Sequence, residues 1–110
     1  MAMLDCKLLI DGQWRGDGRM LTVHNKYSGA EIGALPEVSK EELDEALGAA
    51  ERAARVMAEL PAHRRHAILL RTAELLHEGR EEMARVIAAE AGKALKYARA
   101  EVDRAVSTFT

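Results

Sequence analysis

The chain has 110 residues, which allows at most one small domain. Its 16 basic and 18 acidic residues leave a net charge of −2, a balance that points to neither nucleic acid nor an anionic membrane as a partner. The single cysteine, Cys6, precludes an internal disulfide, and the sequence contains no signal peptide and no long apolar run. We therefore expect a cytoplasmic protein without membrane contact.

Residues 1–38 are predicted to form a β-rich arm. The Asp11-Gly12 pair lies between two short apolar runs, and such a pair favours a two-residue hairpin turn because both turn positions need positive φ. The stretch Gly16–Gly18 predicts a loop. Two further strands are expected around the turn "NKYSG", at residues 20–24 and 31–35.

Residues 39–110 are predicted to be helical. Ser39 and Glu42 have the spacing of a capping box, in which the two side chains accept hydrogen bonds from backbone N–H groups at the start of a helix. Apolar residues then recur at helical spacing in four successive stretches. Pro61 is predicted to begin the second helix at its first position, where the missing N–H costs nothing.

Glycines mark the expected ends of the middle two helices. Gly79 is predicted to close the second helix, and Gly92 follows the third. The apolar stripe of the fourth helix runs from Leu95 to Phe109 and meets Thr110 without a glycine, proline or capping residue. This pattern predicts that the helix does not end at Thr110 and that the chain therefore continues.

The Gly92-Lys93 pair precedes a predicted helix and is a candidate phosphate-binding loop. Such a loop needs several glycines before the lysine and a Ser or Thr after it. Residues 89–91 contain no glycine, and Ala94 follows the lysine. The sequence favours a left-handed helix C-cap at Gly92, with Lys93 near the negative end of the helix dipole.

Two histidines could share one face of the second helix. His63 and His66 are three residues apart, a spacing that metal ligands sometimes use. Arg64 and Arg65 lie between them and would oppose a divalent metal, so solvated surface histidines are favoured.

The basic run from His63 to Arg71 is a candidate nucleic-acid contact. It lacks aromatic residues for base stacking, and a solvated helix face paired with acids such as Glu74 or Glu78 is favoured. Cys6 is a candidate nucleophile, but Asp5 beside it would disfavour the thiolate. The residues alone therefore identify no active site.

Four motifs resemble, in order, the N-terminal segment of the aldehyde dehydrogenase superfamily. They are "LLIDGQW", "TVHNKYSGAEIG", "LPAHRRHAILLRTAELL" and "EAGKALKYARAEV", and together they cover nearly the whole chain. The matching residues are Ile10, Gly12, Trp14, Asn25, Gly29, Glu31, Ile32, Arg65, Ile68, Leu69, Glu90, Gly92, Lys93, Glu101 and Val102. The chain departs from the family's usual pattern at Lys26, Ser28, Met57 and Ala94.

The predicted elements give an α+β fold over this stretch, with a β-hairpin arm followed by about four helices. Residues 1–110 would be an incomplete N-terminal portion of the Rossmann-like cofactor-binding domain, divided into the arm at 1–38 and the helical segment at 39–110. The full enzyme would oxidise an aldehyde to a carboxylic acid with NAD or NADP. The resemblance implies a homodimer or homotetramer.

The family's catalytic cysteine and glutamate, and its dinucleotide-binding strands, lie downstream of the motifs found in this chain. The resemblance therefore implies no catalytic and no cofactor-binding residue among the 110, and the isolated segment is expected to be inactive. It also implies a structural sodium or potassium ion held by the main-chain carbonyls of Thr22 and Val23 and by the Glu101 side chain. The alternative is that these are ordinary strand and surface residues.

Two other functions stay open on the sequence. The chain could be an autonomous helical interaction or assembly module without catalysis. It could also be a small helical regulator that binds nucleic acid through His63 to Arg71, although the net charge weighs against this.

Overall fold

The structure, a computed structural model, describes residues 4–16 and 18–110. Asp17, in the middle of the predicted Gly16–Gly18 loop, lies outside the described residues. The chain divides into two units. The first unit contains the residues up to His24 together with Ala30–Glu59, and the second contains Asn25–Gly29 together with Leu60–Thr110.

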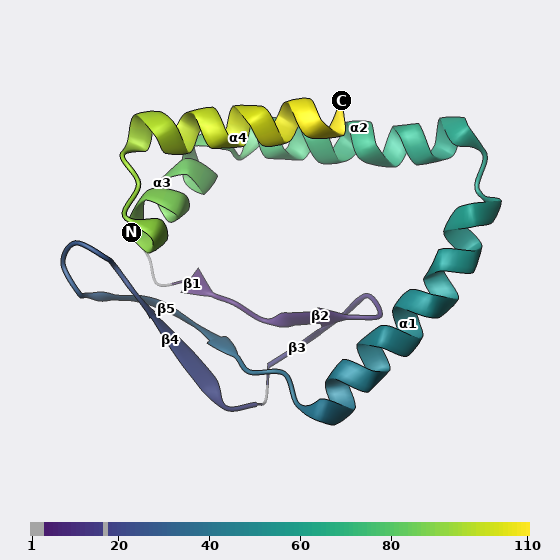
Figure 1. Cartoon of the computed structure of the whole chain (residues 1–110), viewed down its shortest axis with the longest axis horizontal. Helices are drawn as coiled ribbons and strands as arrows, with labels where there is room; N and C mark the ends of the chain where they lie inside the picture. Colours follow the sequence, from purple (N-terminus) through teal and green to yellow (C-terminus); the bar gives the residue numbers. More distant parts are fainter. Residues whose placement is uncertain (1–3, 17) are drawn as a thin grey trace. The chain divides into compact units, whose positions relative to one another are not determined.

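The strands of the first unit form two small sheets (Figure 1). The first sheet has the order β1-β5-β4, with β5 pairing parallel to β1 and antiparallel to β4. The second sheet is the hairpin of β2 and β3. The bounds are Leu4–Asp5 for β1, Leu8–Ile10 for β2, Gln13–Arg15 for β3, Met20–His24 for β4 and Glu31–Pro36 for β5.

The β2–β3 hairpin confirms the turn predicted at Asp11-Gly12. Ile10 pairs with Gln13, which leaves Asp11 and Gly12 as the two turn residues, with φ of 50° and 74°. The strands predicted at 20–24 and 31–35 are confirmed as β4 and β5. The sequence did not predict β1, because a strand of two residues is too short to carry an alternating pattern.

Helix α1, Lys40–Glu59, covers the β2–β3 hairpin in the first unit. The capping box at its start is confirmed: the Glu42 N–H donates to Ser39 Oγ at 3.1 Å, and the Ser39 N–H donates to Glu42 Oε2 at 2.9 Å. Arg15 donates two hydrogen bonds, of 2.5 and 2.6 Å, to the carboxylate of Glu45 on α1. The helix is therefore fixed to the hairpin by a bidentate ion pair.

The second unit contains three helices, α2 (Ala62–Glu78), α3 (Arg80–Ala91) and α4 (Leu95–Phe109). Helix α4 packs against both α2 and α3 (Figure 1). Their core consists of Ala84, Ala98 and Val102, which are at most 2% exposed. Because two of these side chains are alanines, the helix backbones approach closely but each contact buries little apolar area.

The predicted helix ends agree with the structure to within a residue. Pro61 is the N-cap of α2 rather than its first helical residue, with ψ of 149°. Gly79 ends α2 and directly precedes α3. Gly92 ends α3 in the left-handed conformation, with φ of 68°. Four helices follow the β-rich arm, as the sequence predicts, and the α+β class is confirmed.

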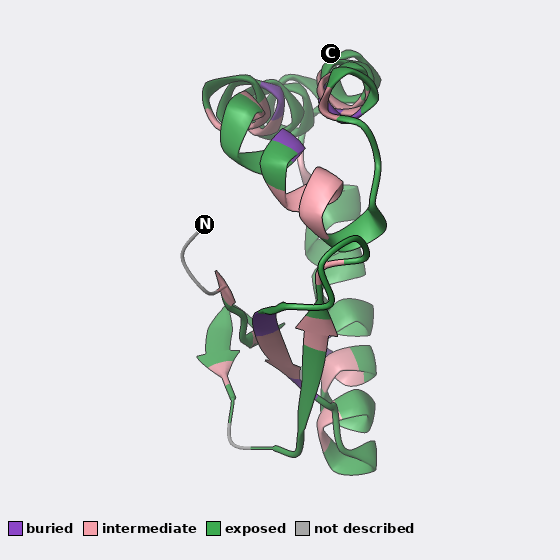
Figure 2. Cartoon of the chain, turned by 90° about the vertical axis from the view of Figure 1, so that its left-hand side faces the viewer, coloured by how far each residue is buried: buried purple, intermediate pink, exposed green. Residues whose placement is uncertain are grey.

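Much of the apolar surface of both units is uncovered (Figure 2). On α1, Leu47 and Val56 are 61% and 62% exposed, and on α2, Ile68 and Leu75 are 49% and 53% exposed. No helix in the described part of the chain combines the length and the apolar character needed to cross a membrane.

Candidate functional site

The candidate nucleophile and the two candidate metal-binding histidines lie at the surface. Cys6, His63 and His66 are all exposed. Among residues 4–16 and 18–110, no three His, Cys, Asp or Glu side chains are grouped so that they could hold a metal ion.

The basic run on α2 is partly neutralised by acids of the same helix. Arg71 Nη1 donates to Glu74 Oε2 at 3.0 Å and to Glu78 Oε1 at 3.3 Å. These hydrogen bonds raise the pKa of the Arg71 guanidinium, the bond to Glu74 most of all. The predicted pairing of this face with Glu74 or Glu78 is confirmed at Arg71.

The turn Asn25–Gly29 is built around the side chain of Asn25. Its Oδ1 atom accepts hydrogen bonds from the Tyr27 N–H at 2.9 Å and from the Ser28 N–H at 3.0 Å, while the Gly29 N–H donates to the Asn25 carbonyl at 2.9 Å. An Asn side chain that bonds the backbone two and three residues on stabilises a tight turn. This is the structural role of the motif "NKYSG".

The same turn contacts the end of α3. The Lys26 N–H donates to the Ala89 carbonyl at 3.4 Å. A Cβ atom added at Gly92 would lie 3.2 Å from Lys26 Cβ, closer than ordinary van der Waals contact. Gly92 therefore serves two purposes, because it allows the left-handed end of α3 and leaves room for the turn.

Lys93 follows this glycine and points its charge at α4. Its Nζ atom forms a hydrogen-bonded ion pair with Glu101 Oε2, and Arg104 Nη2 lies 4.0 Å from the other oxygen, Oε1. The hydrogen bond from Lys93 is the largest cause that lowers the pKa of the Glu101 carboxyl. We name Asn25, Lys26, Gly29, Gly92, Lys93 and Glu101 the turn–elbow cluster.

The turn–elbow cluster brings together two motifs that are far apart in the sequence. The motif around Asn25–Gly29 supplies the turn, and the motif from Glu90 to Val102 supplies the helix end and the ion pair. The Gly-Lys pair is confirmed as a helix terminus. In this cluster Lys93 binds the carboxylate of Glu101, and so the end of α3 is connected to α4 within the second unit.

The predicted ligands of an alkali cation belong to different units. Thr22 and Val23 lie in β4, where a register shift occurs between Val23 and His24. Successive carbonyls of a regular strand point to opposite edges, so two adjacent carbonyls can face one ion only where a strand is irregular. Glu101 lies on α4. The assembly of these three residues into one cation site stays a prediction.

Paired arginines and acids connect α3 to α4. Arg80 donates to Asp103 Oδ1 and Oδ2 at 2.5 and 2.7 Å, and Arg99 donates to Glu81 Oε1 and Oε2 at 2.8 and 2.9 Å. Arg80 also bonds Glu81 at 2.9 Å. Sequence analysis missed this network, since its partners are 18 and 23 residues apart and no local spacing links them.

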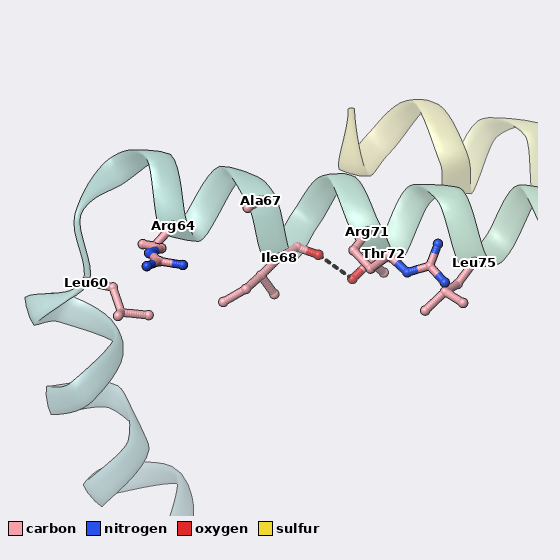
Figure 3. A pocket seen from close by; sticks show the side chains of 7 residues that line it. All are labelled: Leu60, Arg64, Ala67, Ile68, Arg71, Thr72 and Leu75. Carbon is pink, nitrogen blue, oxygen red and sulfur yellow. Dashed lines mark hydrogen bonds between the residues drawn. The ribbon is translucent and has the colours of Figure 1, made fainter.

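An open groove runs along one face of α2 (Figure 3). The volume of this groove is about 760 Å³. The apolar side chains of Ile68 and Leu75 and the basic side chains of Arg64 and Arg71 line it. The other lining residues are Leu60, Ala67 and Thr72. Figure 3 shows Ile68, Thr72 and Leu75 on the face of α2 that is turned away from α4. The groove is thus an apolar surface that the helices of the second unit leave uncovered.

Comparison with known proteins identifies aldehyde dehydrogenases as relatives of this chain. The model of the aldehyde dehydrogenase family matches residues 14–110. The lactaldehyde dehydrogenase of Methanocaldococcus jannaschii is 41% identical over 102 residues, which are 93% of this chain and 22% of that protein. The chain therefore spans about a fifth of the length of this curated relative.

Solved structures show the same fold. The NADP-dependent glyceraldehyde-3-phosphate dehydrogenase from Bacillus halodurans C-125, complexed with NADP, superposes with a TM-score of 0.92 at 29% identity over 96% of this chain and 22% of its own. The NAD-dependent benzaldehyde dehydrogenase from Corynebacterium glutamicum superposes with a TM-score of 0.88 at 36% identity. The match covers 94% of this chain and 23% of the chain of that enzyme.

Proposed function

Because the chain belongs to the aldehyde dehydrogenase family, we propose that it is the N-terminal portion of an oxidoreductase that converts an aldehyde to a carboxylic acid with NAD or NADP. The observation that carries this proposal is the family match over residues 14–110. The relatives include one enzyme described as NADP-dependent and one described as NAD-dependent, which supports either cofactor.

In this proposal the 110 residues have a structural role. A dinucleotide site of the Rossmann type needs parallel strands that lead through a glycine-rich turn into a helix N-terminus. Within the described residues, the parallel pairing is confined to the two-residue contact of β1 with β5. We therefore propose that the dinucleotide binds to another part of the enzyme.

The chemistry is also assigned to residues outside this segment. Oxidation of an aldehyde by this family implies a cysteine that attacks the carbonyl carbon and a glutamate that activates water to release the acid. Cys6 is exposed, and residues 4–10 around it include no histidine or glutamate. We therefore do not propose Cys6 as that nucleophile.

The uncovered apolar faces support a segment that packs against more protein. Leu47 and Val56 on α1, and Ile68 and Leu75 in the α2 groove, are each about half or more exposed. Large contiguous apolar surfaces are unusual in stable monomers and mark contact with another part of the protein or with a partner. We propose that the remainder of the enzyme covers them.

The same surfaces also favour a second candidate function, an autonomous helical interaction module without catalysis. We further propose, from the family, a homodimer or homotetramer of the complete enzyme. A cytoplasmic location belongs to this proposal, because one cysteine in 110 residues suits a reducing compartment.

A turnover assay separates the two functions. NADH or NADPH formation is measured by absorbance with a panel of small aldehydes, first for the 110-residue chain and then for the product of the whole reading frame. We expect no turnover from the short chain and aldehyde-dependent turnover from the whole product. Turnover by the short chain would contradict the structural role, and an inert whole product would favour the interaction module.

A further inference from the structure

The groove along α2 combines apolar and basic side chains at a regular spacing. Ile68 and Leu75 are seven residues apart, and Arg64 and Arg71 are seven residues apart as well. Positions that recur every seven residues lie on one face of a helix, so the four side chains share a narrow strip. Ile68 and Leu75 are about half exposed in this strip (Figure 3). Such a strip is the kind of surface that packs against a second helix.

The charges of α2 are unevenly distributed along its length. The first half of the helix contains two arginines and no acid, whereas both of its acids, Glu74 and Glu78, lie in the second half. Among the residues that the structure describes, Arg64 has no ion-pair partner, and Arg71 is paired with both acids. The helix therefore has an unpaired positive charge near its start and a surplus of negative charge near its end.

This distribution does not favour an isolated helix. The N-terminal end of a helix carries a partial positive charge and the C-terminal end a partial negative charge, so basic residues are unfavourable at the start and acidic residues at the end. Arg64 lies in the first turn of α2, and Glu78 is its last residue. A second helix of the same sequence that runs in the opposite direction supplies the complementary charge at both ends.

We propose that the α2 groove binds the α2 groove of a second copy of this chain, with the two helices antiparallel. A twofold axis relates the copies, so the Arg64 end of each helix lies beside the Glu78 end of the other. A parallel pair would place like charges together at both ends, which is unfavourable. Ile68 and Leu75 of both copies form the apolar centre of the contact.

This inference goes beyond the proposed function, because it concerns the 110-residue chain itself and requires no aldehyde oxidation. Where the remainder of the enzyme covers this face, it takes the place of the second copy. The contact is limited to one face of a 17-residue helix from each copy, about 25 Å long, which lies at the low end of interface sizes. We therefore expect a dimer at high micromolar concentration and a monomer at low micromolar concentration.

The first test measures the mass of the 110-residue chain by sedimentation equilibrium over a range of concentrations. We expect the mass to rise from 12.1 kDa to twice that value and no further, because a twofold contact closes. Raising the salt from about 50 mM to about 500 mM should weaken the dimer several-fold, since salt screens the charges at the helix ends. A chain that stays monomeric, or association that is not weakened by salt, would overturn the proposal.

The second test reverses one charge in each copy. In the antiparallel pair, Arg64→Glu places acids of the two copies side by side and should weaken the dimer by about tenfold or more. In a parallel pair the same substitution would only exchange one like-charge contact for another. Arg55→Glu, at an exposed position of α1, makes the same change in net charge and is the matched control. A dimer of unchanged affinity in Arg64→Glu would contradict the antiparallel pairing.

The third test restores the charges and removes the apolar centre. The double variant Arg64→Glu with Glu78→Arg exchanges the two ends of the helix and should recover the affinity that Arg64→Glu loses. Ile68→Gln should abolish the dimer while the circular dichroism spectrum stays the same, because this side chain is half exposed in the monomer. Failure of the double variant to recover, or a dimer that persists in Ile68→Gln, would refute the proposal. These readouts do not involve aldehyde turnover, so failure here is distinguishable from failure of the proposed enzyme function.

Discussion

At the scale of single residues, Gly92 is the most constrained position of the second unit. Its φ of 68° lies in the left-handed region, and Lys26 Cβ would be 3.2 Å from an added Cβ. The sequence predicted the first constraint, because a glycine after an apolar helical stretch is a local signal. It did not predict the second, because Lys26 is far away in sequence and reaches Gly92 only through the fold.

We expect Gly92→Ala to lower the free energy of unfolding by about 1–2 kcal/mol, from the left-handed backbone alone, with the Lys26 contact adding to it. Urea unfolding followed by circular dichroism measures the change. Gly92→Asn separates the two causes, since asparagine tolerates the left-handed region but still carries a Cβ atom. An equal loss in both variants would assign the effect to the Lys26 contact.

Gly48 is the matched control. It lies within α1, where an added Cβ would meet only the flexible end of Arg52, at 3.5 Å. Gly48→Ala should raise the stability of the helix by about 0.5–1 kcal/mol, because alanine loses less backbone entropy than glycine. If both glycine substitutions changed stability in the same direction, the special role of Gly92 would be refuted.

At the scale of elements, small residues of α3 and α4 set how closely these helices pack. Ala84 and Ala98 are 0% exposed. We expect Ala98→Leu to destabilise the second unit by about 1–3 kcal/mol, because the added methyl groups have no space between α4 and its neighbours. Ala100→Leu, at an exposed position of the same helix, should change stability by less than about 0.5 kcal/mol. Equal losses in urea unfolding would contradict this packing.

The ion pairs between α3 and α4 make stability depend on pH. The hydrogen bond from Arg80 is the largest cause that lowers the pKa of Asp103. The hydrogen bond from Arg99 is the largest cause that lowers the pKa of Glu81. A carboxyl whose pKa is lower in the folded state contributes stability that is present above its unfolded pKa, about 4, and is lost as pH falls through the folded pKa.

We therefore expect the melting temperature to fall on acidification below about pH 4.5, and Asp103→Asn to make that fall smaller. Glu82→Gln, one residue along α3 from Glu81, is the matched control. A melting temperature that does not change between pH 6 and pH 3 would show that these pairs contribute nothing measurable at the exposed surface where they lie.

The helices, strands and turns were largely predictable from the sequence, whereas the side-chain contacts between them were not. The capping box of Ser39 and Glu42 and the turn at Asp11-Gly12 depend on neighbouring residues, so their patterns are local. The Arg80–Asp103 pair joins residues 23 apart, and its partners meet only once α3 and α4 have packed. Sequence spacing holds no information about such pairs.

At the scale of the whole molecule, the α2 groove separates the two candidate functions. Ile68→Gln and Leu75→Gln replace half-exposed side chains, so each should leave the stability of the 110-residue chain within about 0.5 kcal/mol. In the product of the whole reading frame, the same substitutions should cost about 2 kcal/mol or more, because they would place polar groups in a buried contact. Equal small effects in both proteins would mean that the enzyme leaves this face exposed.

The central claim is that this segment is one structural part of an aldehyde dehydrogenase whose reacting residues lie further along. The most direct measurement is the nucleotide sequence of the gene beyond the codon for Thr110. We predict that the reading frame continues and encodes strands and glycine-rich turns for the dinucleotide, followed by a cysteine and a glutamate suited to the reaction. A stop codon directly after Thr110 would contradict the account.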